Sequence, residues 1–315
     1  MITLAGYNNL ELIQVGDNTI IYRGQSELEQ KPVIIKTILD KYPTLEQITQ
    51  LKHEHQLLKS LEIPGVIKAY RLENYQRGLF LILEDINGQF LQQFFLAKNI
   101  KLSEFLKIAI QLAVTLEELH QNKIIHKDIN PQNIIINPET GQVKITDFSI
   151  ASRLDKENQA ISNPNLLEGT LAYMSPEQTG RMNRVIDYRT DFYSLGVTFY
   201  EMLTGQVPFQ ATEPLELVHC HIAKQPIPPK KLSPEIPNVV SDIVMKLLSK
   251  TAEDRYQSAQ GLRADLEQCL ATLSATGKIL DFVIGQQDKS GQLLIPQKLY
   301  GRGAEVGTLM MPLSE

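Results

Sequence analysis

The residues best suited to chemistry lie in the stretch HKDINPQN at 126–133. Asp128 could accept a proton from a hydroxyl group, and Asn133, five residues later, offers a carbonyl oxygen to a hard cation. A helix-period segment ends near Asn122, just before the stretch, and the apolar run at 134–136 follows it. Both side chains are therefore expected in a turn whose ends are anchored in hydrophobic structure. By itself, this spacing is equally typical of a capped turn without chemistry.

A second carboxylate, Asp147, follows eleven residues after Ile136. It closes a short β-like segment at 143–146. Two short strands joined by a turn return the chain to the end of the sheet from which it started. We therefore predict that Asp147 lies beside Asp128.

A lysine–glutamate pair is predicted in the first third of the chain. Residues 44–47 (TLEQ) form a capping-box pattern that begins a helix running to about Leu61. Glu54 falls on the inward face of this helix, whose apolar stripe is Leu45, Ile48, Leu51, Leu58 and Leu61. A buried carboxylate needs a cation, because an isolated buried charge is too costly. Lys36, at the end of a β-branched strand, is the natural partner.

In chain order, these residues resemble the motifs of eukaryotic-like (Hanks-type) serine/threonine protein kinases. HKDINPQN is similar to the catalytic loop H-R-D-x-x-x-x-N, and residues 147–149 (DFS) are similar to D-F-G. GTLAYMSPE at 169–177 resembles the end of the activation segment, with the Gly-Thr pattern of serine/threonine rather than tyrosine kinases. The resemblance further implies that Asp191 caps the catalytic-loop backbone and that Arg255 pairs with Glu177.

The resemblance implies an α+β, bilobal protein kinase fold over about residues 1–275. The N-lobe, about 1–85, would be small and β-rich with one key helix, and the C-lobe, about 86–275, would be large and mainly helical. A helix capped by Ser103 would lead the chain into the catalytic loop. Strands are expected at 10–15, 20–24, 32–36, 67–73 and 79–84.

The same resemblance implies ATP and Mg²⁺ as cofactors. Asp128 would be the catalytic base, and Asn133 and Asp147 would bind the metal. Lys36, oriented by Glu54, would contact the α- and β-phosphates of ATP. The other nucleotide contacts would come from Gly16 in the phosphate loop, Leu83 as gatekeeper, and the backbones of Glu84 and Ile86, which would hydrogen-bond the adenine.

Four features depart from the family pattern. Asn130, counted with Asp128 and Lys36 among the catalytic positions, stands where most serine/threonine kinases have the lysine that neutralises the γ-phosphate. Lys127 replaces an arginine, Ser149 replaces the glycine of D-F-G, and only Gly16 remains of the three loop glycines. The proton acceptor, both metal ligands and the lysine–glutamate pair are nevertheless all present.

These residues predict an active or weakly active kinase that transfers the ATP γ-phosphate to serine or threonine of a protein substrate in signal transduction. Phosphoryl transfer depends on charge stabilisation and positioning, so one missing cation should lower the rate without removing the activity. The first alternative is an ATP-binding pseudokinase with a regulatory role. The second is an interaction scaffold that binds no nucleotide. Nucleotide binding excludes the scaffold, and phosphate transfer excludes the pseudokinase.

Composition limits the class of partner and the cellular compartment that we expect for this protein. The 315 residues are 43% hydrophobic and carry a net charge of −5, which argues against a nucleic-acid-binding face. Cys220 and Cys269 lie far apart and are expected to be buried thiols in a reducing cytoplasm. No signal peptide is visible, and no run of about 18 apolar residues predicts a transmembrane helix.

Residues 276–315 form a tail beyond the kinase match. The run LIPQKLYGR at 294–302 resembles a junction in bacterial, notably cyanobacterial, multi-domain signalling kinases. In those proteins the kinase is followed by a P-loop ATPase-like module and by sensor and histidine-kinase domains. We expect residues 282–284 and 293–295 to dock partly and residues 301–315 to be disordered. We therefore expect the chain to be a kinase module detached from, or truncated out of, such a protein, ending before an ATPase module.

Overall fold

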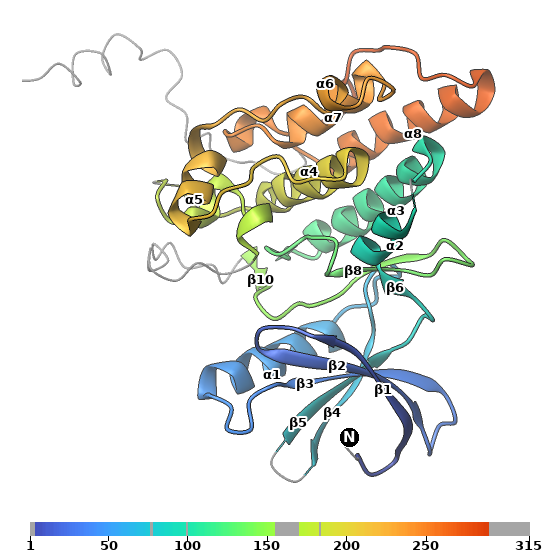
Figure 1. Cartoon of the computed structure of the whole chain (residues 1–315), viewed down its shortest axis with the longest axis vertical. Coiled ribbons are helices and arrows are strands. Elements are labelled where there is room, and N and C mark those ends of the chain that lie inside the picture. Colours follow the sequence, from blue (N-terminus) through green and yellow to red (C-terminus); the bar gives the residue numbers. More distant parts are fainter. Residues whose placement is uncertain (1–3, 76–77, 99, 155–169, 183, 290–315) are drawn as a thin grey trace, which may run out of the picture.

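The N-terminal part of the chain forms a five-stranded antiparallel sheet (Figure 1). The computed structural model describes residues 4–75, 78–98, 100–154, 170–182 and 184–289. The strand order is β1-β2-β3-β5-β4. All five predicted strands are confirmed, as β1 Tyr7–Val15, β2 Thr19–Ser26, β3 Pro32–Ile38, β4 Ala69–Tyr75 and β5 Gly78–Glu84.

The middle strand of this sheet, β3, is buried on both faces. Val33 and Ile35 pack into a small cluster with Tyr7 on one face. Ile34, between them, points to the opposite face and joins the main hydrophobic core. Successive side chains of a strand alternate between faces, so the apolar run of β3 covers both. This burial places Lys36, two residues after Ile34, on the side of the sheet that faces the cleft.

Helix α1, Leu45–Lys59, packs against β4 and β5. Its predicted capping box is confirmed: the amide of Gln47 donates to the Thr44 hydroxyl at 3.2 Å, and the Thr44 amide donates to Oε1 of Gln47 at 2.8 Å. Glu54 lies on the buried face, as predicted. Leu45 does not: it is the first residue of α1 and is 80% exposed.

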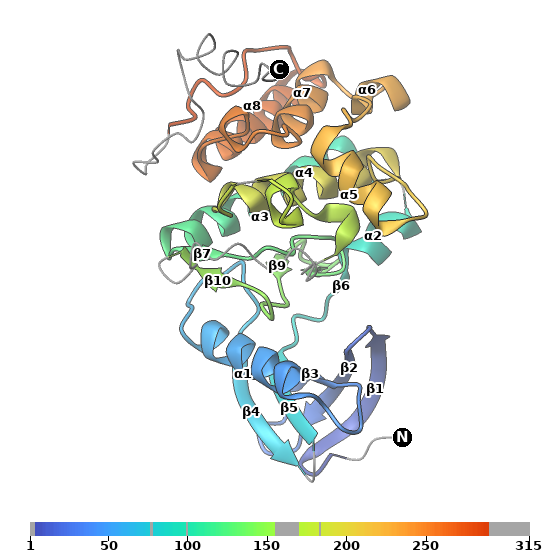
Figure 2. The same ribbon diagram turned by 90° about the vertical axis from the view of Figure 1, so that its left-hand side faces the viewer.

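The C-terminal part of the chain is mainly helical and lies beyond the sheet along the long axis of the molecule (Figure 2). Helix α3, Leu102–Gln121, packs on α8, and α4 packs on α7. Ser103 does not cap α3, which begins one residue earlier with Lys101 as its N-cap. The other helices are α2 Leu91–Ala97, α4 Arg189–Thr204, α5 Pro214–Ala223, α6 Pro229–Leu232, α7 Asn238–Leu247 and α8 Ala259–Thr276. The α+β bilobal architecture is confirmed.

Two small sheets hold the loops that carry the candidate residues. In the first, β8 pairs with β6 on one side and with β9 on the other. In the second, β7 pairs with β10. The loop at 126–133 runs from β7 to β8, and residues 146–149 follow β9, so the sheets fix the ends of both loops. Their bounds are β6 Gln89–Phe90, β7 Ile124–Ile125, β8 Ile134–Ile136, β9 Val143–Ile145 and β10 Ser152–Arg153.

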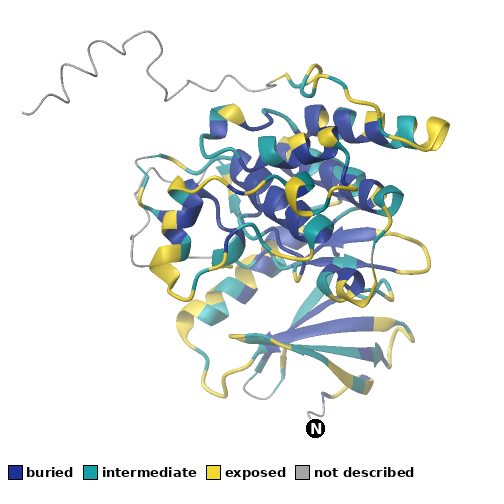
Figure 3. Ribbon diagram, turned by 45° about the horizontal axis from the view of Figure 1, so that its top comes forward, coloured by how far each residue is buried: buried dark blue, intermediate teal, exposed yellow. Residues whose placement is uncertain are grey.

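The chain continues past α8 as an extended segment, residues 277–289, which packs on the C-lobe and is called the strap below (Figure 3). Phe282 and Ile284 pack against the main core, whereas Val283 is 70% exposed. The carboxylate of Asp288 accepts hydrogen bonds from the amides of Gln257 and Ser258, directly before α8. The predictions for residues 293–295 and 301–315 lie outside the described residues.

Candidate active site

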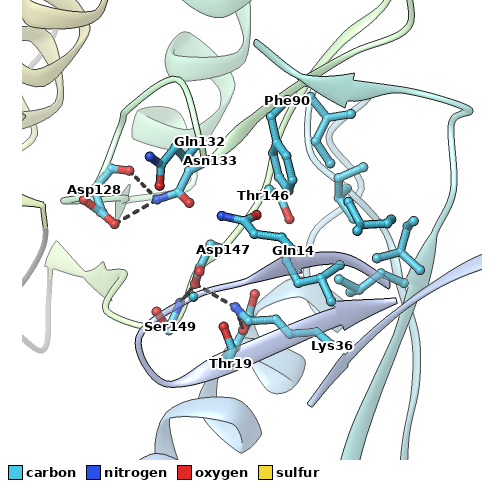
Figure 4. Close-up of a pocket in the computed structure, with 18 of the residues that line it drawn as sticks. Gln14, Thr19, Lys36, Phe90, Asp128, Gln132, Asn133, Thr146, Asp147 and Ser149 are labelled. Atoms are coloured by element: carbon cyan, nitrogen blue, oxygen red, sulfur yellow. Dashed lines mark hydrogen bonds and ion pairs between the residues drawn. The ribbon is translucent and has the colours of Figure 1, made fainter. Parts of the chain in front are cut away.

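A cavity of about 740 Å³ lies between the sheet and the helical lobe. Figure 4 shows Lys36 and Asp147 pointing toward one another in it, with Asp128 and Asn133 on the opposite wall. Residues far apart in the sequence therefore meet in one cleft. The predicted site residues that line it are Gly16, Lys36, Glu54, Leu83, Glu84, Ile86, Asp128, Asn133 and Asp147.

Lys36 is bound by two carboxylates. Its Nζ lies 2.8 Å from Oε2 of Glu54 and 2.9 Å from Oδ1 of Asp147. Burial disfavours the ammonium, but the negative charges of Asp147 and Glu54 outweigh it and raise the pKa of Lys36. Lys36 is therefore charged. The predicted Lys36–Glu54 pair is confirmed.

The two carboxylates differ in environment. Glu54 is fully buried, and this desolvation raises its pKa to about 6 despite the attraction of Lys36. Asp147 is also penalised by burial, but Lys36 and hydrogen bonds from Ser149 lower its pKa to about 2. Oε1 of Glu54 also accepts the amide of Phe148 at 3.2 Å, which ties α1 to the segment that carries Asp147. Asp147 is thus the carboxylate that stays ionised and open to the cleft.

Asp128 is held by groups of its own loop and by the distant Thr170. Its Oδ2 accepts a hydrogen bond from Nδ2 of Asn133 at 2.8 Å, and its Oδ1 accepts the amide of Thr170 at 2.9 Å. Its own amide donates to Nδ1 of His126 at 3.2 Å. Nδ1 must then be unprotonated, so Nε2 carries the hydrogen and donates to the Thr146 carbonyl at 3.0 Å. His126 is thereby a neutral, fully buried brace between the two loops.

Asp191 holds the backbone at the start of the loop at 126–133. Its two carboxylate oxygens accept the amides of His126 and Lys127, at 3.0 and 2.8 Å. Asp191 is fully buried in the first turn of α4, and Nε2 of His120 also binds it at 2.9 Å. The predicted capping of the catalytic loop is confirmed. The N-cap of α4 is Tyr188, so Asp191 does not cap its own helix.

Asn130 is buried inside the loop and does not line the cavity. Its side-chain amide donates to the Asp128 carbonyl and to the Thr170 hydroxyl, both at 3.2 Å, and its Oδ1 accepts the amides of Gln132 and Asn133. It therefore occupies the loop as a neutral hydrogen-bonding residue. The catalytic role assigned to this position from the sequence stays a prediction.

The donor set at the cleft suits a hard cation. The Nδ2 group of Asn133 is engaged with Asp128, which leaves its carbonyl oxygen as a metal ligand, and Asp147 supplies a carboxylate. No cluster of three or more His, Cys, Asp or Glu side chains able to hold a metal occurs among the described residues. A mixed Asp–Asn pair is typical of Mg²⁺ sites that are completed by water and substrate phosphates.

The apolar end of the cleft suits a nucleotide base. Leu83, Ile34 and Ile135 line it. The amide of Glu84 donates to the Lys68 carbonyl, and its side chain binds Lys144 at 2.7 Å. The amide and the side chain of Glu84 are thus both engaged by the protein, and its backbone contact with the base stays a prediction.

Gly16 lies in a tight turn at the mouth of the cleft, where its amide donates to the Thr19 carbonyl at 2.8 Å. A Cβ on Gly16 would lie 3.5 Å from that oxygen, an ordinary contact, so the turn itself does not require glycine. Gly16 is consistent with a phosphate loop but does not identify one.

A separate buried ion pair lies outside the lining of the cavity. Arg255 binds Glu177 through two parallel contacts of 2.6 and 2.8 Å, as predicted. Its other donors reach the backbone carbonyls of Arg189, Ser249 and Lys250. Arg255 holds the pKa of Glu177 below its ordinary value although burial acts in the opposite direction.

Sequence reasoning missed two residues at the site. The sequence indicates Thr170 only as part of the Gly-Thr pattern of serine/threonine kinases, but its amide binds the Asp128 carboxylate. Gln178, directly after Glu177, donates to the carbonyl of Lys127. Neither contact joins residues close in sequence, so no local pattern could indicate it.

Comparison with known proteins defines the class. The protein kinase domain family matches residues 7–266, and the chain belongs to this family. It is 34% identical over 264 residues to a probable serine/threonine-protein kinase of Clostridium perfringens, covering 83% of this chain and 38% of that protein. It is 29% identical over 263 residues to the serine/threonine-protein kinase PrkC of Bacillus subtilis, covering 83% and 40%.

A further relative is much longer. The chain is 31% identical over 299 residues to the hybrid signal transduction histidine kinase G of Dictyostelium discoideum, covering 67% of this chain and 9% of that protein. The chain thus spans less than half the length of these curated relatives. None of the helices in the described part of the chain is both long and apolar enough to cross a bilayer.

Proposed function

We propose that this chain is a serine/threonine protein kinase module that transfers the γ-phosphate of ATP to hydroxyl groups of a protein substrate. One observation carries the proposal. The Lys36–Glu54 pair, Asp147, and the bonded pair Asp128 and Asn133 all line a single cleft. The similarity to bacterial serine/threonine-protein kinases supports the choice of acceptor.

In this mechanism Asp128 accepts the proton of the attacking hydroxyl. Its two carboxylate oxygens are oriented by Thr170 and Asn133, so the group needs little rearrangement before reaction. Lys36 supplies a positive charge to the nucleotide phosphates, and Glu54 keeps that charge in place. Asn133 and Asp147 would hold Mg²⁺, which neutralises charge on the phosphate oxygens when bound.

The asparagine at position 130 lowers the expected rate. A lysine there would add a cation near the transferred group, and removal of one stabilising group of this kind is worth roughly 3–4 kcal/mol by analogy with an oxyanion donor. Asn130 instead keeps the loop ordered through Asp128 and Thr170. A slow kinase therefore fits better than a pseudokinase, since the proton acceptor, both metal ligands and the lysine–glutamate pair are retained.

Transfer of labelled γ-phosphate from Mg·ATP to a generic protein substrate and to the chain itself tests the proposal. The wild type should incorporate label, and Asp128→Ala should lose at least about 100-fold, because general-base catalysis contributes on that scale. Asp128→Ala should keep its nucleotide affinity and its thermal stability. Nucleotide binding without transfer in the wild type would identify a pseudokinase, and equal activity in Asp128→Ala would reject its role as base.

We also propose that the chain works as one module of a multi-domain signalling protein. The partial match to a hybrid histidine kinase and the resemblance of residues 294–302 to a kinase–ATPase junction support this organisation. ATPase, sensor and histidine-kinase modules are then the expected neighbours. We place the activity in the cytoplasm, where ATP is available and where the buried free thiols of Cys220 and Cys269 stay reduced.

A further inference from the structure

The residue before the candidate base has an unusual backbone. Lys127 has a φ of +70°, in the left-handed region that side chains other than glycine rarely adopt. Relaxation of Lys127 to an ordinary conformation would rotate the following peptide and with it Asp128. Such a conformation persists only where the surroundings hold it. The groups that bind the backbone of Lys127 therefore determine where Asp128 points.

One side of this backbone is held by Asp191. Its carboxylate accepts the amides of His126 and Lys127, as described above. Both of these contacts are to N–H groups that precede the Lys127 α-carbon. They do not restrain the carbonyl of the peptide group between Lys127 and Asp128, which belongs to Lys127. The N–H of that peptide group donates to Nδ1 of His126 at 3.2 Å.

The carbonyl of that peptide group is held by Gln178. Its Nε2 donates to the Lys127 carbonyl at 2.7 Å, across 51 residues of sequence. Its Oε1 accepts the amide of Ser175 at 3.0 Å. One partner is an acceptor and the other a donor, so the orientation of the side-chain amide follows from its contacts. Gln178 is only 9% exposed, and little water can replace either bond.

The turn that carries Gln178 is itself rigidly anchored. Gln178 lies in the short helical turn Pro176–Thr179. The hydroxyl of Ser175 lies 2.8 Å from that of Thr190 on α4, and Glu177 forms the buried pair with Arg255. The Gln178 donor is therefore fixed relative to α4, the same helix that carries Asp191.

We propose that Gln178 is a positioning residue for phosphoryl transfer, which holds the Lys127 carbonyl so that Asp128 faces the substrate hydroxyl. This inference rests on the proposed kinase function. Gln178 does not line the nucleotide cavity, so it acts on turnover and not on ATP binding. Asp191 and Gln178 together hold both sides of a strained residue.

The test uses two variants of the full chain. Gln178→Glu, assayed at about pH 8 where a glutamate is ionised, keeps an oxygen for the Ser175 amide but cannot donate to the Lys127 carbonyl. Gln178→Met loses both bonds. Both variants should lower kcat about tenfold, as expected for one buried hydrogen bond, while the KM for ATP changes less than about twofold. Both variants should also lower the thermal stability, because Gln178→Glu places an unpaired carboxylate at a buried position and Gln178→Met loses both bonds.

Relief of the backbone strain gives the decisive comparison. Glycine adopts a positive φ without penalty, so Lys127→Gly removes the need for the brace. The loss caused by Gln178→Glu should shrink to less than about threefold when measured against Lys127→Gly alone. An equal loss in both backgrounds, or a kcat loss confined to Gln178→Met, would show that Gln178 only stabilises its own turn. An active wild type with unchanged kcat in Gln178→Glu would reject this role but leave the kinase proposal standing, whereas an inactive wild type would reject both.

Discussion

Two buried clusters of oppositely charged side chains in the described part of the chain are built in different ways. At Arg255, one guanidinium meets one carboxylate, Glu177, and its remaining donors reach backbone carbonyls. At Lys36, one ammonium is shared by two carboxylates, Glu54 and Asp147. The first cluster is saturated with partners. The second has an excess of negative charge and opens onto a cavity.

The difference shows in the pKa values. Both Glu177 and Glu54 are penalised by burial, yet the pKa of Glu177 is lowered and that of Glu54 is raised to about 6. Arg255 neutralises a single partner, whereas Lys36 divides its charge between Glu54 and Asp147. A saturated pair stabilises the fold, and an unsaturated one leaves a carboxylate for a cation and a cation for a phosphate. The arrangement of partners, more than burial, separates a structural ion pair from a functional one.

The largest expected effect comes from breaking the saturated pair. Arg255→Ala leaves Glu177 buried without its cation and should lower the free energy of unfolding by about 3–5 kcal/mol. Denaturant unfolding measures this loss. Arg263→Ala, which removes an exposed arginine paired with Glu267, is the matched control and should change stability by about 0.5 kcal/mol or less. Similar effects for both variants would mean that the Arg255 pair is not a structural centre.

The unsaturated cluster should tolerate loss of a carboxylate without unfolding. Asp147→Ala leaves the Lys36–Glu54 pair intact, so the unfolding midpoint should stay within a few degrees of wild type. Phosphoryl transfer should fall about 100-fold or more, because about 3 kcal/mol of metal-assisted stabilisation is lost. Thermal unfolding and labelled-phosphate transfer measure the two effects separately. Unfolding as severe as that of Arg255→Ala would erase the contrast between the clusters.

The two carboxylates around Lys36 should respond oppositely to pH. The pKa of Glu54, about 6, lies above its ordinary value of 4.5, so its contribution to stability is present below pH 4.5 and is lost as the pH rises through 6. The pKa of Asp147, about 2, lies below its ordinary 3.8, so its contribution is present above that pH and is lost as the pH falls through 2. Asp147 therefore does not titrate in the window where Glu54 does.

The raised pKa of Glu54 predicts that the difference in unfolding free energy between the wild type and Glu54→Gln changes with pH. Between about pH 4.5 and 6, the wild type should lose up to ~2 kcal/mol of unfolding free energy relative to Glu54→Gln, the equivalent of a shift of roughly 1.5 pH units. Unfolding curves of both proteins at several pH values measure the difference. A constant difference across this window would mean that Lys36 keeps Glu54 ionised throughout.

The contrast between the clusters also separates what the sequence could and could not predict. Lys36 and Glu54 were paired correctly because a carboxylate on an apolar helical stripe demands a cation. Arg255 and Asp191 followed from their order in a family motif. The sharing of Lys36 with Asp147 could not be predicted, since it depends on how two lobes approach one another. The contacts of Gln178 and Thr170 were missed for the same reason, because each joins segments more than 40 residues apart.

Errors in the secondary structure were local. Ser103 has the composition of an N-cap, but α3 starts at Leu102, since a single polar residue near a helix start fits several registers. Leu45 has helical spacing, but it is 80% exposed at the start of α1. Sequence periodicity identifies a face of a helix and not the length over which that face is covered.

The smallest expected effect concerns the attachment of the strap to the residues directly before α8. Asp288 accepts two amides and the Ser258 hydroxyl directly before α8, and Gly261 leaves room for it, because a Cβ there would lie 2.5 Å from the Asp288 α-carbon. Asp288→Ala should weaken this attachment by about 1 kcal/mol, as loss of a helix cap does. Trypsin cleavage after Lys278 should then become about fivefold faster by mass spectrometry.

Asp281→Ala is the matched control within the same strap. Asp281 contacts only the exposed amide of Asn238 among the described residues, so its removal should leave the cleavage rate unchanged. The stable fragment of the wild type should then reach past residue 288, further than the boundary near residue 275 suggested by the family resemblance. If wild type and Asp288→Ala were cut after Lys278 at the same rapid rate, the strap would be a loosely attached linker. The folded unit would then end with α8.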